Sequence, residues 1–161
     1  MDRNYFDKKV EEFFSEAEKL IPDELLPDLP LISPDVHDWY DFEHQLWEVG
    51  EEIRIFLREN NRKLNKYQIE KAVDICLDKR AKRGRQSFVM LLGRKMYADY
   101  ADKIVSLLND DDVDGHVIAS LYKMQVGGYS VYIEPFLNHN RKWIRNEAER
   151  YITKYGKQIR T

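Results

Sequence analysis

The sequence predicts an all-α protein built from stacked antiparallel helical hairpins, with a helical arm at its N-terminal end. Apolar residues recur at steps of three and four along most of the 161 residues, which is the period of an amphipathic helix. No stretch sustains the alternation of apolar and polar residues that a strand requires. The segments 101–119 and 130–148 also repeat one pattern after a shift of 29 positions.

The internal repeat aligns residues of similar chemistry. The shift places Asn109 on Asn138 and Tyr122 on Tyr151. Each copy reads as a helix ending in an apolar pair, a short polar turn, and a second helix with a small residue on its inner face. A hairpin of this length cannot bury its apolar stripe alone, so repetition at this period favours stacking. An irregular helical domain whose hairpins match by chance is the alternative.

A looser third copy precedes these two, with helices expected at 66–77 and 84–93 and with Arg85 at the position of His116 and Arg145. Three helical pairs would then span residues 64–156. The pattern resembles the HEAT repeat, and the matching residues are Leu107-Leu108-Asn109-Asp110, Ile144-Arg145-x-x-Ala148 and Leu92-Gly93. HEAT-like stacks are mostly binding scaffolds, so the resemblance implies a protein-binding surface and no reaction.

Upstream of the repeats, the sequence predicts two helices joined by a proline-rich connector. Residues 4–20 carry an amphipathic stripe that Pro22 ends. The connector 21–34 holds four prolines, which disfavour helix, and its many leucines predict that it packs against the body of the domain. Residues 35–38 offer N-cap candidates for a long helix to about residue 60, in which Gly50 indicates a close helix crossing or a slight kink.

The remaining helices are expected to be joined by short turns. Connections of this length are typical of helical bundles and solenoids. Gly156 is expected to end the last helix, and a basic tail follows it. The expected turns lie at 79–85, 95–99, 109–114, 127–128 and 139–141.

The length of the chain suits a single domain over 1–161, with residues 1–60 as its acidic N-terminal helices. The single cysteine, Cys76, lies among apolar residues, which excludes a disulfide framework and indicates a buried thiol in a reducing compartment. The charged N-terminal stretch does not read as a secretory signal, and no apolar run approaches the ~18 residues of a membrane span. We therefore expect a cytoplasmic protein.

Charge is distributed unevenly along the chain. Residues 1–60 hold 17 Asp and Glu against 6 Lys and Arg, a net charge of −11, whereas residues 61–161 hold 12 against 20, a net charge of +8. Such a polarised distribution bears on association and steering. The alternative is that the two halves neutralise each other inside the fold.

The sequence offers no catalytic set, and we expect neither an enzyme, nor a cofactor, nor a metal site. The four histidines fall in different elements, and no pair has the spacing of a zinc site. His116 is expected to be structural because the other copies carry arginine there. Asp110–Asp114 lacks the ligand spacing of a calcium loop, so Asp112 or Asp114 is expected to cap the following helix.

These features favour a protein-binding module. Size, repeat type, acidic surface and abundant tyrosine are similar to immunity proteins of bacterial contact-dependent inhibition systems, which implies a basic toxin domain, most plausibly a nuclease, as the partner. An acidic cover can speed capture and block a nucleic-acid groove, and tyrosine and tryptophan are common binding hot spots. The candidate partner-binding residues are Asp110, Asp111, Asp112, Asp114, Glu48, Glu51, Glu52, Tyr97, Tyr100, Tyr129 and Trp143.

Two other functions compete with this hypothesis. Nucleic-acid binding would use the basic segments 79–85 and 141–145. The acidic half and a sequence pI of about 5.9 oppose it, and a solvated basic ridge paired with the acidic helices is the expected state of these segments. A HEAT-like lyase or glycosylase would need a pocket of perturbed carboxylates, for which the sequence offers no set.

Overall fold

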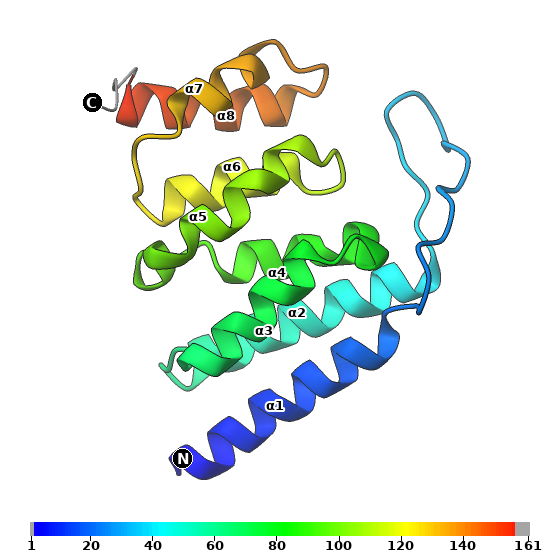
Figure 1. Ribbon diagram of the computed structural model, residues 1–161, viewed down its shortest axis with the longest axis vertical. Helices are drawn as coiled ribbons and strands as arrows, with labels where there is room; N and C mark the ends of the chain where they lie inside the picture. Colours follow the sequence, from blue (N-terminus) through cyan, green and yellow to red (C-terminus); the bar gives the residue numbers. More distant parts are fainter. Residues whose placement is uncertain (1, 157–161) are drawn as a thin grey trace. The chain divides into compact units, whose positions relative to one another are not determined.

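The computed structural model describes residues 2–156, and its regular elements are all helices (Figure 1). Within these residues the only β feature is a single bridge between Ser33 and Val36, which confirms the all-α class for the part described. The chain divides into two compact units, Met1–Leu91 and Leu92–Thr161, which are described in turn. The single domain over 1–161 stays a prediction, and the predicted basic tail after Gly156 lies outside the described residues.

The first unit is a cluster of four α-helices and one 3₁₀ helix. They are α1 (Arg3–Leu20), α2 (Asp41–Glu59), α3 (Lys66–Leu77), the 3₁₀ helix η1 (Lys79–Arg85) and α4 (Gln86–Leu91). The predicted helices 4–20 and 66–77 are confirmed. Each long helix buries one apolar stripe, and removing that surface from water stabilises the unit. The stripes are Phe6, Val10, Phe14 and Ala17 in α1, Leu46, Val49, Ile53 and Leu57 in α2, and Ile69, Ala72, Val73 and Cys76 in α3.

Local signals define the start of α3. The Asn65 side chain accepts the Gln68 N–H at 2.8 Å, and the Gln68 side chain accepts the Asn65 N–H at 3.0 Å. This reciprocal arrangement satisfies two backbone donors that the first turn of a helix leaves without partners. The start of α3 is therefore set by residues next to it in sequence.

The start of α2 differs from the prediction. The helix begins at Asp41, after Tyr40, so the N-cap candidates at 35–38 were wrong. Glu43 determines this start, because its Oε2 accepts the Tyr40 N–H at 2.7 Å and its Oε1 accepts the Arg83 N–H at 2.9 Å. Glu43 is only 1% exposed, and the two backbone donors offset the cost of burying its carboxylate.

Gly50 lies where α2 crosses α4, which confirms the predicted close crossing. A Cβ at residue 50 would lie 2.8 Å from the Ser87 Cβ and 3.1 Å from the Phe88 ring. The first distance is shorter than van der Waals contact allows. Glycine therefore lets the two helix backbones approach one another at this point.

The predicted turn 79–85 is a compact 3₁₀ helix interrupted by one unusual residue. Lys82 has φ 49° and ψ −133°, in the half of conformational space that favours glycine and costs other residues about 1–3 kcal/mol. The Arg85 side chain is fully buried, and its Nε donates to the Lys82 carbonyl at 2.7 Å. Lys82, Arg83 and Arg85 are all buried, so the expected solvated basic ridge was wrong for these three residues.

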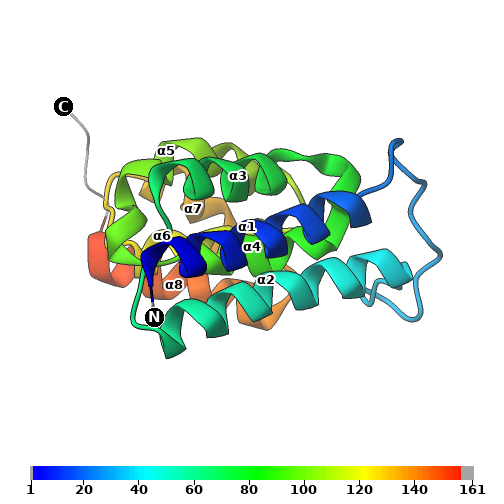
Figure 2. The same ribbon diagram turned by 90° about the horizontal axis from the view of Figure 1, so that it is seen from below.

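The connector between α1 and α2 extends beyond the ends of both helices before the chain returns to α2 (Figures 1 and 2). We call it loop 21–40. The exposed fractions are 59% for Leu25, 53% for Leu31, 67% for Ile32 and 46% for Val36. The prediction that the connector 21–34 packs its apolar residues against the domain is therefore wrong for Leu25, Leu31 and Ile32.

The second unit contains two matching pairs of short helices. Its helices are the 3₁₀ helix η2 (Lys95–Tyr100), α5 (Ala101–Ile104), η3 (Val105–Asn109), α6 (Asp114–Lys123), α7 (Ser130–Ile133), η4 (Glu134–Asn138) and α8 (Lys142–Tyr155). The pair α5–η3 begins at Ala101 and ends at Asn109, and the pair α7–η4 begins at Ser130 and ends at Asn138, a shift of 29 residues at both ends. The sequence repeat thus recurs in the elements, while the stacking of hairpins into a solenoid stays a prediction.

The two copies differ in their second helix. In α6 the side chains of Val117 and Leu121 are fully buried, as is that of its C-cap residue Met124. Shifting by 29 positions gives Asn146, Arg150 and Thr153 of α8, and these three residues are exposed. Helix α8 therefore buries a single stripe, formed by Ile144, Ala148 and Tyr151, and presents a polar face to solvent.

Candidate functional site

Polar contacts within loop 21–40 and between the loop and η1 hold the base of the loop. The Tyr40 hydroxyl donates to the Pro27 carbonyl at 2.6 Å, and the Lys82 Nζ donates to Asp28 Oδ1 at 2.7 Å. The Arg80 Nη1 reaches the Asp23 carbonyl at 3.3 Å. These contacts hold the base of the loop and leave residues 29–39 projecting.

A tight turn shapes the projecting end of the loop. The Ile32 N–H donates to the Val36 carbonyl, and the Val36 N–H donates to the Ser33 carbonyl, each at 2.9 Å. Asp35 adopts φ 63° within this turn, a left-handed conformation that aspartate tolerates better than most residues. The exposed Leu31, Ile32 and Val36 therefore sit on or beside a hydrogen-bonded turn.

The same part of the chain is strongly acidic. Residues 20–53 contain ten Asp and Glu and no Lys or Arg. Asp35 and Asp38 are exposed in the loop, and Glu48 and Glu52 are exposed on α2. Loop 21–40 and the outer face of α2 therefore combine carboxylates with uncovered apolar side chains, and uncovered apolar groups of this kind mark interaction surfaces.

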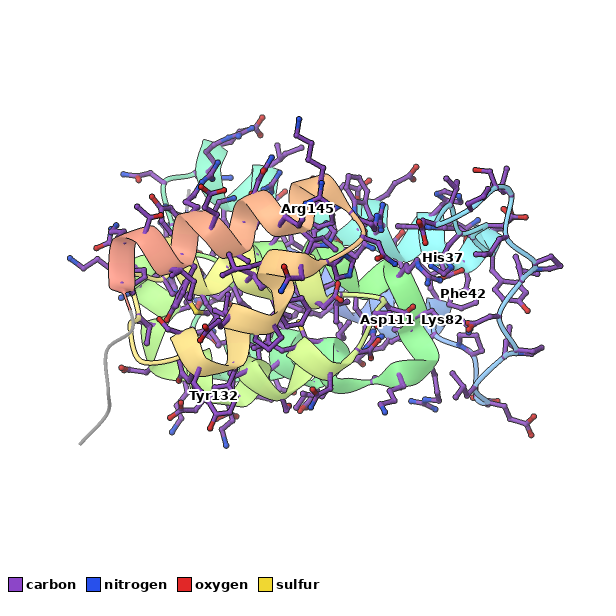
Figure 3. All side chains as sticks on the ribbon, turned by 90° about the horizontal axis from the view of Figure 1, so that it is seen from above. His37, Phe42, Lys82, Asp111, Tyr132 and Arg145 are labelled. Atoms are coloured by element: carbon purple, nitrogen blue, oxygen red, sulfur yellow. The ribbon has the colours of Figure 1, made fainter. Side chains whose placement is uncertain are left out.

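The attachment between Asp28 and Lys82 joins an exposed side chain to a buried one. The Lys82 side chain is 5% exposed whereas that of Asp28 is 72% exposed, so the ammonium reaches outward from the buried η1 segment. The hydrogen bond from Lys82 holds the pKa of Asp28 below its ordinary value. Figure 3 labels Lys82 near the base of the loop, with His37, whose charge also acts on Asp28.

The predicted glutamates lie on α2 in the first unit. Glu48 and Glu52 are exposed, and Glu51 is half-buried. The Arg54 Nε lies 2.7 Å from Glu51 Oε2, one turn away on the same helix. Glu48 and Glu52 are thus the two predicted glutamates that present their carboxylates to solvent.

The predicted aspartates lie in the turn before α6, in the second unit. Asp111 is exposed and Asp112 half-buried, while Asp110 Oδ1 accepts the Asp112 N–H at 3.0 Å. The N-cap residue of α6 is Val113, so the prediction that Asp112 or Asp114 caps this helix was wrong. Asp114 is the first helical residue, and its carboxylate accepts the adjacent Gly115 N–H at 2.7 Å.

Asp114 and His139 form a partly buried polar pair, and His116 lies two residues after Asp114 on α6. Burial raises the pKa of Asp114 to about 6, and the His139 Nε2 lies 3.8 Å from its Oδ2. Burial lowers the pKa of His116 to about 4, so its imidazole is neutral at neutral pH. The imidazole packs edge-on against the Trp143 ring, with 5.0 Å between the ring centres. Within residues 2–156 no group of three or more such side chains is placed to hold a metal ion.

Two of the four predicted aromatic anchors are interior. Tyr97 is 1% exposed and Tyr129 is 3% exposed, and the Tyr129 hydroxyl donates to Asp102. Their burial argues against a partner-binding role for these two tyrosines. Tyr100 is half-buried, and Trp143 is 36% exposed beneath the Arg141 guanidinium, whose Cζ is 5.7 Å from the ring centre.

The basic segments of the alternative hypothesis expose four of their eight cations, namely Lys79, Arg80, Arg141 and Lys142. In 79–85, Lys79 and Arg80 are exposed, and Arg80 is engaged by Asp78 through a 2.7 Å contact. In 141–145, the Arg145 Nη1 donates to the carbonyls of His139 and Asn140 at 2.7 and 3.0 Å, which closes the turn before α8. Much of the basic charge in these segments therefore serves internal contacts.

A shallow, open hollow of about 550 Å³ lies between α6 and α8. Arg150 and Lys154 both stand over the Tyr122 ring, at 5.6 and 5.0 Å from its centre. Such cation–π contacts cover an exposed ring. Asn146, Glu149 and Thr153 complete the lining, which contains no histidine or cysteine.

Comparison of the chain with protein-family models, with curated proteins and with solved structures found no match. Among residues 2–156, no helix combines the length and apolar character that a bilayer crossing requires.

The residues that the sequence analysis missed are the apolar ones of loop 21–40. Leucines among prolines were interpreted as a packed connector, and the structure leaves Leu25, Leu31 and Ile32 exposed. One signal was present in the sequence: no lysine or arginine occurs between Lys19 and Arg54. An apolar, proline-rich segment inside such an acidic stretch could have been recognised as a candidate docking loop.

Proposed function

We propose that this protein acts by stoichiometric binding of a basic protein partner, and that loop 21–40 with the exposed glutamates of α2 forms the binding surface. The observation that carries this proposal is the uncovered apolar end of the loop, with Ile32 67% exposed, inside a stretch without any lysine or arginine. Apolar side chains supply affinity once water is excluded, and the surrounding carboxylates select a cationic partner.

In its most specific form, the protein is an immunity protein that blocks a basic nuclease toxin domain in the cytoplasm. A nuclease holds a polyanion, so its substrate groove is cationic. An acidic surface is attracted to such a groove and speeds association with it. The repeated hairpins of the second unit would then belong to a HEAT-like scaffold, in line with the binding role that such scaffolds have.

Nucleic-acid binding is the alternative function. The burial of Lys82, Arg83 and Arg85 weighs against it, because buried side chains cannot reach phosphates. A mobility-shift assay with tRNA and duplex DNA at low salt separates the two functions. The proposed function expects no shift, whereas nucleic-acid binding expects a shift that weakens steeply with salt.

The proposed function is tested by purifying the tagged protein from its native host with its bound partner. We expect one basic partner in a one-to-one complex. Replacing Leu31 and Ile32 by serine should weaken the complex at least tenfold, because the two most exposed neighbouring apolar side chains of the loop are lost. The affinity of the purified pair, measured by calorimetry, provides this comparison.

The matched control replaces Val131 and Tyr132, which are 70% and 60% exposed on α7. Tyr132, labelled in Figure 3, belongs to the second unit. Serine at both positions removes a similar apolar area and should leave the affinity unchanged. Equal affinity for the loop variant and the wild-type protein would show that the loop is not the binding surface.

A further inference from the structure

Lys82 occupies a backbone conformation that suits glycine. Its φ of 49° and ψ of −133° are strained for a residue with a Cβ. Glycine would adopt this conformation without that strain, and glycine is already present two residues later at Gly84. A lysine in such a position indicates that its side chain makes a contact whose stabilisation offsets the backbone strain.

The backbone and the side chain of Lys82 serve different neighbours. Its carbonyl accepts the Nε of the buried Arg85 at 2.7 Å, which organises η1 itself. Any residue at position 82 can offer that carbonyl. The side chain instead passes out of the buried segment and donates to Asp28 Oδ1 at 2.7 Å, in the loop. Of these two groups of Lys82, only the side chain contacts the loop, where a second residue of η1, Arg80, meets the Asp23 carbonyl.

Asp28 lies where the projecting part of the loop begins. It follows Pro27, whose carbonyl accepts the Tyr40 hydroxyl at 2.6 Å, so two anchors meet at neighbouring residues. Beyond these anchors, the backbone–backbone hydrogen bonds of the 32–36 turn join residues of the turn to one another. The Pro27–Asp28 anchor therefore fixes the direction in which residues 29–39 leave the unit, and the stacking of Trp39 on His44, with 4.9 Å between ring centres, fixes where they return to α2.

We infer that Lys82 is a positioning residue, which holds the proposed binding loop in its binding shape through Asp28. This inference rests on the proposed function of loop 21–40. A loop that is already ordered loses less conformational freedom when it binds, so its ordering raises affinity without any contact to the partner. Lys82, with its side chain 5% exposed, would act in this way.

The first test uses the protein alone and measures hydrogen exchange of the Ile32 and Val36 amides, which are hydrogen-bonded in the turn. Lys82→Met keeps the length of the side chain but loses its charge, and Asp28→Asn removes the partner charge from an exposed position. Both should speed exchange in residues 29–39 at least fivefold. Lys82→Arg, which retains a cation, should restore most of the protection.

A matched control is provided by Lys71, whose Nζ lies 3.5 Å from Glu18 Oε1 and which makes no contact with the loop among those described. Lys71→Met removes a lysine of the same unit and should leave the exchange of residues 29–39 unchanged. Unchanged exchange in both Lys82→Met and Asp28→Asn would overturn the inference.

The second test measures the affinity of these variants for the purified partner. Lys82→Met and Asp28→Asn should each bind about five- to tenfold more weakly, Lys82→Arg close to wild type, and Lys71→Met as wild type. A loosened loop with unchanged affinity would also overturn the positioning role. Failure of the proposed function looks different: the Leu31 and Ile32 variant then binds as wild type, whatever the exchange of the Lys82 variants.

Discussion

Asp114 and His116 show how one helix start perturbs two ionisable side chains in opposite directions. Burial raises the pKa of Asp114 to about 6 and lowers the pKa of His116 to about 4. Charges on His139, Asp111 and Arg141 also act on Asp114, and charges on Arg141 and Lys123 act on His116. Both groups are therefore favoured in their neutral forms by the fold.

The two shifts make opposing contributions to the pH dependence of stability. The folded state holds the Asp114 proton more tightly than the unfolded state does. This contribution is therefore fully present below 3.8, the ordinary pKa of an aspartate, and is lost as pH rises through about 6. The His116 contribution is fully present above 6.5, the ordinary pKa of a histidine, and is lost as pH falls toward about 4. Between pH 4 and 6, the contribution of Asp114 to stability falls as pH rises, while the contribution of His116 increases.

Single substitutions should separate the contributions of Asp114 and His116 to the pH dependence of stability. In Asp114→Asn, which keeps an acceptor for the Gly115 N–H, stability should rise with pH from 4.5 to 6.5 more steeply than in the wild type. In His116→Gln, stability should fall relative to the wild type over the same range. Urea unfolding followed by circular dichroism at several pH values measures both. Parallel curves for all three proteins would contradict the assigned protonation states.

At the scale of the element, local sequence signals predicted the helices that local residues define. The start of α3 follows from its N-cap residue Asn65 and from Gln68 in its first turn. The start of α2 could not be predicted in the same way, because Glu43 is fixed partly by the distant Arg83 N–H. The 3₁₀ helix at 79–85 is likewise shaped by buried contacts of Arg85 that no periodicity encodes.

The candidate site was predicted only in part, for a related reason. The acidic character of residues 1–60 is visible in composition, and Glu48 and Glu52 are exposed as a binding surface requires. Leucine is equally compatible with a packed connector and a projecting loop. The choice between the two depends on tertiary contacts such as that of Asp28 with Lys82, 54 residues apart.

The crossing of α2 and α4 provides a prediction for packing. Gly50→Ala should lower the free energy of unfolding by about 1–3 kcal/mol, because the new Cβ overlaps Ser87, although alanine is the better helix former. Glu52→Ala on the same helix is exposed and should change stability by about 0.5 kcal/mol or less. Urea unfolding compares the two variants, and equal stability would show that the helices separate without cost.

At the scale of the whole molecule, negative and positive charges are used differently. Acidic residues of the 20–53 stretch such as Asp35 and Glu48 face solvent. Several basic residues, among them Lys82, Arg83 and Arg85, are interior. Residues 20–53 carry ten Asp and Glu and no Lys or Arg, whereas the formal net charge of the whole chain is only −3, and this local excess agrees with attraction to a cationic partner.

The absence of lysine and arginine from residues 20–53 also determines which proteases can cleave loop 21–40. Trypsin cuts after lysine and arginine, and none occurs between Lys19 and Arg54. Under native conditions trypsin should leave loop 21–40 intact even though it projects into solvent. Thermolysin, which cuts before large aliphatic residues, should cleave at the exposed Leu31–Ile32 bond, and mass spectrometry of the fragments distinguishes the two digests. Resistance to trypsin would then reflect the absence of cleavage sites in this loop, with no bearing on how rigidly it is held.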